Sequence, residues 1–407
     1  MNKIKLCTLV IPPLLMLSGA SQAEETGLAE LLSAVDGNPR VTEGRADLRS
    51  AQAGLELATL QTAPRIRLSL DSDVAHSEDA TRRAEVKFEK SLFDWGKAQA
   101  SIDVAQARKE AKELSVLART DELRRNVINQ FAQGAAELEK VAVFERALEE
   151  LGELEANMSR RVAQRISPET ELRVVQSQIR QLQLLIRESM GQIRNAELAL
   201  LQSTGLAVTE WALPLCSVGQ SERELVTSAF DASSELKVQQ AEIQVLQASL
   251  LRLEKSHLPE LIGGVGLTGD LERMESDSRA YLSVQYEADW VGRNRAEYAE
   301  HQAKLDAALA AEQAIINQLL RDVGDLLNQY RTSRDLQPTY ELLIEAQEQQ
   351  VSSQNRRFKS GLSSWLDVLS AQEEVTRTRT ALVQARATQC RSALLLDELT
   401  KAGQLDG

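Results

Sequence analysis

Residue types that commonly carry out chemistry are few in this sequence and far apart. The three histidines, His76, His257 and His301, do not have the spacing of a metal-binding motif such as HExxH. The sequence also lacks a P-loop, a nucleophile elbow and a zinc-type pair of cysteines. Carboxylates are abundant, but on amphipathic helices they usually form the solvated face. We therefore expect no catalysis, no metal and no cofactor.

Cys216 and Cys390 are the two cysteines that follow the first 23 residues. In an oxidising compartment they could form a disulfide. Two unpaired buried thiols fit the sequence nearly as well, so the sequence leaves the pairing open.

The first 23 residues have the order of a secretory signal peptide. Lys3 and Lys5 precede an apolar stretch that ends in Ser21-Gln22-Ala23. Cleavage before Glu24 would remove the two lysines and change the formal net charge from −13 to −15. An acidic chain of this kind argues against a nucleic-acid partner, whose phosphates require basic residues. No later window of about 18 apolar residues predicts a transmembrane helix.

The sequence contains two copies of one pattern, related by a shift of 195 positions. Asp94-Trp95 aligns with Asp289-Trp290, and Pro64 aligns with Pro259. Chance similarity between alanine-rich helices is the alternative. One register that joins a proline and a rare Asp-Trp pair argues against chance, so we expect two tandem structural repeats.

Each repeat has the same predicted order: a helix, a pair of strands, a long helix and a returning helix. The helices end close to Pro64 and Pro259 because proline disfavours helix in the preceding residue. Pro338 lies inside the second long helix and predicts a kink. We expect a signal peptide over 1–23, a first repeat over 24–205, a linker over 206–224, a second repeat over 225–403 and a tail over 404–407. Within the repeats we expect strands at about 64–95 and 259–290, long helices at 97–164 and 293–359, and returning helices at 168–204 and 364–402, with coiled-coil heptads.

The predicted strands have the alternation of half-buried β-structure and are about ten residues long, enough to cross a bilayer when tilted. Four strands cannot close a barrel, which needs about eight. Trp95 and Trp290 lie where strands meet helices, as in an interfacial aromatic girdle. Ordinary core anchors are the alternative for these tryptophans. Strands of this kind would have to combine with those of further copies.

Two segments resemble a known family. Leu92-Phe93-Asp94-Trp95-Gly96, followed by an alanine-rich helix, resembles the strand-to-helix junction of the TolC family of outer-membrane channels. The segment RFKSGLSSWLDVLSAQ, from Arg357 to Gln372, resembles the periplasmic turn and rising helix of that family. The resemblance covers essentially the whole mature chain.

The resemblance implies a mostly α-helical homotrimer in the cell outer membrane and its lipid. Four strands per chain would form a 12-stranded β-barrel, and long antiparallel coiled-coil helices would form a periplasmic α-barrel. Such a channel is a passive exit duct for small-molecule efflux or type I protein secretion. A periplasmic adaptor protein would join it to an ABC or proton-driven inner-membrane transporter. Opening of its periplasmic mouth would untwist the inner coiled coils against the outer helices.

The same resemblance assigns roles to particular residues. Asp367 would narrow the periplasmic aperture, with Ser370 where a second carboxylate is expected. The tips that dock the adaptor would be Arg165, Ile166 and Ser167, and Gly361, Leu362 and Ser363. Arg165 departs from the family pattern, which has glycine there, and this puts the geometry of the first turn in doubt. The barrel–helix junctions would be formed by Pro64, Asp94, Trp95, Gly96, Pro259, Asp289, Trp290 and Gly292.

A soluble periplasmic adaptor or a structural coiled-coil protein is the competing interpretation. Such a protein would share secretion, long helices and a few strands. It would not need a strand pair and neighbouring aromatic residues at matching positions of two repeats. The cargo, whether drug, metal or protein, stays open.

Overall fold

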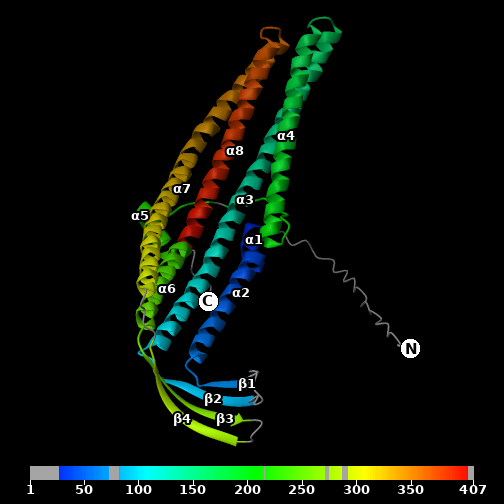
Figure 1. The fold of residues 1–407 in the computed structure, drawn as a ribbon. Helices are drawn as coiled ribbons and strands as arrows, with labels where there is room; N and C mark the ends of the chain where they lie inside the picture. Colours follow the sequence, from blue (N-terminus) through cyan, green and yellow to red (C-terminus); the bar gives the residue numbers. More distant parts are fainter. Residues whose placement is uncertain (1–26, 73–81, 215, 271–274, 287–291, 402–407) are drawn as a thin grey trace, which may run out of the picture.

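The computed structural model describes residues 27–72, 82–214, 216–270, 275–286 and 292–401. The chain forms an elongated bundle of helices with a small β-sheet at one end (Figure 1). The expected signal peptide over 1–23, the tail over 404–407, Asp289 and Trp290 lie outside the described residues.

The two repeats have the same order of elements, which confirms the predicted fold class. The first repeat contains α1 (Leu28–Ala34), η1 (Val35–Gly37), α2 (Pro39–Leu60), β1 (Arg65–Ser72), β2 (Arg82–Phe93), α3 (Lys97–Ala163) and α4 (Glu169–Thr204). The second contains α5 (Glu222–Ala232), α6 (Ser234–Ser256), β3 (Glu260–Asp270), β4 (Glu275–Gln285), α7 (Arg293–Lys359) and α8 (Trp365–Lys401). Pro64 and Pro259 each lie between a helix and the strand that follows it.

The segment between the repeats is slightly shorter than the linker expected over 206–224. α5 begins at Glu222 because Ser221 and Glu224 form a capping box. The Ser221 side chain accepts a hydrogen bond from the Glu224 backbone N–H, and the Glu224 side chain accepts one from the Ser221 backbone N–H. We call residues 206–221 the strap, because they run from the end of α4 to the start of α5.

The four strands form one antiparallel sheet in the order β1-β2-β3-β4, so β1 and β4 are its edge strands. The register places apolar residues opposite one another on one face of the sheet. These side chains are 37–76% exposed in the single chain: Ile66, Leu68, Val86, Phe88, Val265 and Leu267. The other face carries polar residues, among them Glu85, Lys87 and Glu89. The sheet therefore has an apolar face that the chain itself does not cover.

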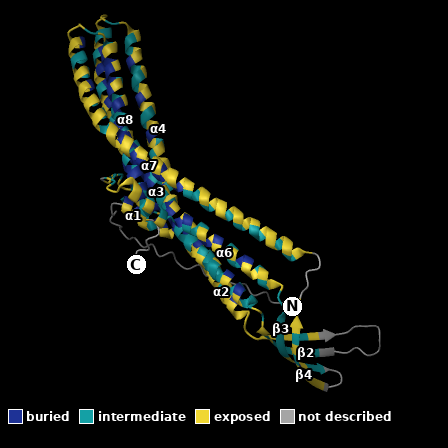
Figure 2. Cartoon of the chain, turned by 90° about the vertical axis from the view of Figure 1, so that its left-hand side faces the viewer, coloured by how far each residue is buried: buried dark blue, intermediate teal, exposed yellow. Residues whose placement is uncertain are grey.

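Three clusters of buried side chains form the core of the helical part. One joins α1, η1, α2, α3 and α4, and includes the fully buried Phe131. A second joins α5, α7 and α8 around Val323 and Leu396. A third lies in the half of the bundle remote from the sheet and includes Met158. Figure 2 shows buried positions on facing sides of the helices and exposed positions on their outer sides.

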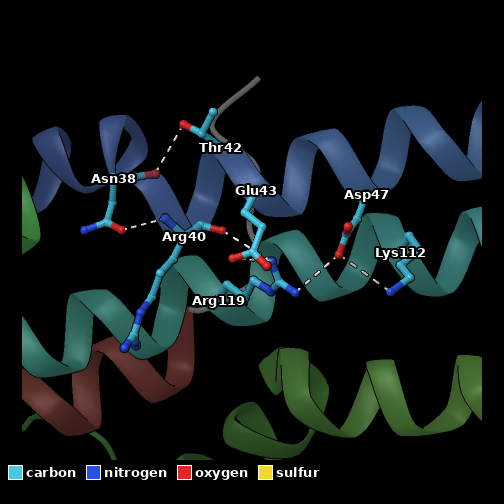
Figure 3. A network of polar contacts seen from close by, with 7 residues as sticks. All are labelled: Asn38, Arg40, Thr42, Glu43, Asp47, Lys112 and Arg119. Atoms are coloured by element: carbon cyan, nitrogen blue, oxygen red, sulfur yellow. Dashed lines mark hydrogen bonds and ion pairs between the residues drawn. The ribbon is translucent and has the colours of Figure 1, made fainter.

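α2 is attached to α3 by a network of polar contacts centred on Arg119 (Figure 3). The Arg119 guanidinium donates to the Asp47 carboxylate at 3.4 Å and to the Arg40 carbonyl at 3.4 Å. Lys112 lies 3.7 Å from the same carboxylate. Asn38 caps α2 by accepting a hydrogen bond from the Arg40 backbone N–H at 2.9 Å. The Asn38 side-chain amide also donates to the Ser203 carbonyl at 2.8 Å, which joins the start of α2 to the end of α4.

α7 continues through Pro338 as expected, and the kink at this proline stays a prediction. Among the described residues, none of the helices combines the length and the apolar character that crossing a membrane requires.

Candidate functional site at the helix tips

The chain reverses direction between α3 and α4 in a tight turn at Arg165. This residue has a positive φ of 59°, in the left-handed region. The Arg165 backbone N–H donates to the Val162 carbonyl at 2.9 Å, and that of Ile166 donates to the Arg161 carbonyl at 2.8 Å. These bonds satisfy carbonyls at the end of α3 that the helix itself leaves free.

The turn between α7 and α8 has the same geometry, with Gly361 at a φ of 76°. The Gly361 N–H donates to the Phe358 carbonyl at 3.0 Å, and that of Leu362 donates to the Arg357 carbonyl at 2.8 Å. The doubt about the first turn is therefore resolved, because Arg165 adopts the conformation that glycine adopts in the second. Left-handed backbone at a residue with a Cβ costs about 1–2 kcal/mol.

Replacement of Arg165 by glycine is expected to stabilise the first tip by about 1 kcal/mol, because the left-handed strain is removed. Denaturant-induced unfolding of the purified protein would measure the change. Gly361→Arg places the same strain in the second tip and should have the opposite effect. A loss of stability in Arg165→Gly would show that the arginine side chain contributes more than its backbone strain costs.

Both turns present an apolar side chain to solvent. Ile166 is 58% exposed and Leu362 is 73% exposed. Each occupies the position directly after the left-handed residue. The two tips thus have matching apolar surfaces, beside the hydroxyl groups of Ser167 and Ser363.

Asp367 is exposed and caps the start of α8. Its Oδ2 accepts hydrogen bonds from the Ser363 hydroxyl at 2.8 Å and from the Ser364 backbone N–H at 3.1 Å. The Ser364 hydroxyl in turn accepts a bond from the Leu366 N–H at 3.2 Å. The carboxylate therefore fixes the second tip to its helix and also places a negative charge at the helix N-terminus, where it is favourable. Ser370 is exposed one turn later, and its hydroxyl donates to the Leu366 carbonyl at 2.8 Å.

The first strand-to-helix junction is built around Asp94. Its carboxylate accepts hydrogen bonds from the Gly96 N–H at 2.9 Å and from the Ala98 N–H at 2.8 Å. Trp95 and Gly96 both have positive φ, at 56° and 80°. The Trp95 ring meets that of Phe93 edge to face at 4.8 Å and is 53% exposed. The Asp94 carboxylate thus stabilises the sharp change of chain direction between β2 and α3, and the Trp95 side chain stays on the surface.

In the second repeat, Gly292 precedes α7 with a φ of 79°, like Gly96 before α3. Asp289 and Trp290, the counterparts of Asp94 and Trp95, lie outside the described residues.

Described residues of the strap contact three helices, α3, α8 and α7. Trp211 stacks on Phe131 of α3 with ring centroids 5.4 Å apart. Cys216 is joined to Cys390 of α8 by a disulfide. The Val218 N–H donates to the hydroxyl of Tyr330, on α7, at 3.1 Å.

Sequence reasoning missed the capping role of Asp367 and the partner of Trp211. The spacing Ser364-x-x-Asp367 is the pattern of a capping box and could have revealed the first. For the second, Phe131 and the neighbouring Gly134 lie on a helix far away in sequence, and no local pattern indicates that Trp211 packs there.

A model of the outer membrane efflux protein family matches residues 31–206 and 225–400, one segment in each repeat. None of the curated protein sequences matches the chain.

Solved structures with the same fold include several outer-membrane channels. OprN has a TM-score of 0.82 and 16% identity, over 92% of this chain and 90% of that one. VceC of Vibrio cholerae has a TM-score of 0.80 and 15% identity, over 92% of this chain and 96% of that one. CmeC of Campylobacter jejuni has a TM-score of 0.80 and 13% identity, over 99% of this chain and 94% of that one. The family match in both repeats, with a fold shared over almost the whole length, shows that this chain belongs to the outer membrane efflux protein family.

Proposed function

We propose that this chain is one subunit of a homotrimeric exit duct, with the sheet in the outer membrane and the helices in the periplasm. The observation that supports this most directly is the exposed apolar face of a sheet with two edge strands, β1 and β4. In lipid, the amide groups of an edge strand cost several kcal/mol each when they are unpaired. Pairing of β4 of one copy with β1 of the next would satisfy them and close a barrel of twelve strands from three chains.

Cross-linking and conductance test this assembly together. The mature protein, purified in detergent, should cross-link to a trimer and form pores in planar lipid bilayers. A protein released by osmotic shock, monomeric and without pores, would contradict the proposal and would favour the soluble adaptor.

We further propose that the tips are the surface on which a periplasmic adaptor protein docks. Ile166 and Leu362 support this, because two matching apolar side chains are exposed at the end of the bundle. An inner-membrane transporter, either ABC or proton-driven, would complete the system, and the family description favours efflux over type I secretion. The duct itself would be passive.

Asp367 is proposed to line the periplasmic aperture, where three copies would gather negative charge and bind cations. Asp367→Asn and Asp367→Ala separate this role from capping. The asparagine variant keeps an oxygen that can accept from the Ser364 N–H, whereas the alanine variant loses it.

Both variants are therefore expected to need a severalfold higher concentration of a divalent cation for half-block of the single-channel current. Only the alanine variant should also lose stability, by about 1 kcal/mol. Cation block that is unchanged in Asp367→Asn would show that the carboxylate serves only as a cap.

A further inference from the structure

The polar face of the sheet is the more sheltered of its two faces. On β2, the side chains of Glu85 and Lys87 are 25% and 33% exposed. Val86 and Phe88, which alternate with them and point to the other face, are 37% and 47% exposed. A sheet that curves toward its polar face shelters the side chains on that face in this way. We call the polar face the inner wall.

An aromatic side chain lies along this inner wall. In the register of the sheet, Gly264 of β3 stands between Glu89 of β2 and Tyr281 of β4. The Tyr281 hydroxyl donates a hydrogen bond to the Glu89 carboxylate. Because these two residues stand on opposite sides of β3, the tyrosine side chain crosses β3 over Gly264 to make the bond. The ring is therefore folded against the wall and does not project from it.

This crossing depends on the absence of a side chain at Gly264. A Cβ there would lie 2.6 Å from Cζ and 2.7 Å from the hydroxyl oxygen of Tyr281, well inside van der Waals contact. Glycine inside a strand often marks a place where another group approaches closely. The tyrosine is that group here, and Glu89 supplies the partner that its hydroxyl requires. Gly264 makes room for the ring, and Glu89 anchors it.

We propose that Tyr281 is a size-determining residue of the lumen, and that Gly264 and Glu89 hold its ring flat against the wall. This inference rests on the proposed trimeric channel, in which the apolar face of the sheet meets lipid and the inner wall faces the lumen. Three copies would place three tyrosines around the lumen. Flat rings leave the lumen open to bulky cargo, whereas rings that stand off the wall would narrow it from three sides.

Displacement of the ring by one methyl group tests the proposal. Gly264→Ala adds the Cβ that the Tyr281 ring cannot accommodate. Gly266→Ala is the matched control, because Gly266 also lies on the inner wall of β3 and a Cβ there meets nothing closer than 3.9 Å. The first variant should narrow the lumen, and the second should leave its width unchanged.

A thiol beyond the ring measures the width of the lumen. Ser283 lies on the same face as Tyr281 and two residues closer to α7, so a reagent that enters from outside the cell passes Tyr281 first. Every variant would carry Ser283→Cys, and intact cells would be treated with maleimides attached to polyethylene glycol of graded mass. The native cysteines are paired and do not react.

In Gly264→Ala, we expect the largest polymer that labels Ser283→Cys to be severalfold smaller in mass than in the parent. Gly266→Ala should have the limit of the parent. An unchanged limit in assembled trimers of Gly264→Ala would overturn the inference.

Removal of the ring separates its displacement from a general effect of alanine in β3. The double variant Gly264→Ala/Tyr281→Ala should regain at least the limit of the parent, because no ring is left to project into the lumen. A limit that stays low in the double variant would contradict the role of Tyr281.

Glu89→Ala is a second test, which leaves Gly264 in place and decides the matter if Gly264→Ala does not assemble. The tyrosine loses its anchor, so the limit should fall. Glu85→Ala is the control, because it removes an inner-wall carboxylate of β2 that contacts Lys87 at 2.8 Å. Equal limits in these two variants would contradict the anchoring that the inference requires.

A failure of the proposed channel would give a different result. Ser283→Cys alone would then react with none of the polymers on intact cells and would react only after the cells are lysed. Labelling of the parent on intact cells, with a limit that no substitution at Gly264 or Glu89 changes, would instead reject only the role of Tyr281.

Discussion

Loss of the disulfide is expected to lower the free energy of unfolding by up to about 5 kcal/mol in the double variant Cys216→Ser/Cys390→Ser. The bond joins residues 174 positions apart, so the loop that it closes in the unfolded chain is long. A cross-link between distant residues removes conformational entropy from the unfolded state, and in the chain-entropy model the effect grows with the length of the loop. Denaturant midpoints of the purified protein would measure the loss.

Reduction of the native protein should reproduce the effect of the double variant, and the same reductant should leave the double variant unchanged. Serine at both positions avoids a leftover thiol, which could pair between copies. Equal denaturant midpoints for the oxidised and reduced protein would show that the strap holds its place by packing alone.

The fold class follows from local signals in the sequence. Gly96 and Gly292 precede the two long helices, and Gly361 follows the second of them. Each of these glycines has a left-handed backbone, which interrupts a helix without any help from tertiary contacts. Arg165 has the same backbone but gives no such signal in the sequence. Because these signals recur in both repeats, the repeat architecture can be predicted from one sequence.

The contacts that hold the tips and the strap could not be predicted in the same way. The Arg379 side chain donates to the Glu150 carboxylate, 229 residues away, and Trp211 meets α3 at a glycine that could equally have been a surface position. Heptad spacing says which face of a helix is buried but not which of several helices covers it. The roles of the aperture and tip residues in transport stay predictions, because they depend on copies of the chain and on partners.

Replacement of Gly134 by valine is expected to lower the free energy of unfolding by about 3 kcal/mol, because it would displace Trp211. A Cβ at Gly134 would lie 2.1 Å from Cζ3 of the Trp211 indole, far inside van der Waals contact. The indole is fixed from the other side by Phe131, which is fully buried in the first core cluster. The ring must therefore leave its place, and the strap loses its contact with α3. Denaturant unfolding would measure the loss.

Gly152→Val is the matched control, since Gly152 also lies in α3 and a Cβ there meets nothing within 4 Å. It should change stability by only a few tenths of a kcal/mol, as expected for helix propensity alone. Similar losses in the two valine variants would contradict the role of Trp211. The triple variant that combines Gly134→Val with both serines should lose less than the sum of the separate effects. The Trp211 packing and the disulfide both fix the strap. Once one of them is lost, part of the strap is already free, so the loss of the other lowers the stability by less.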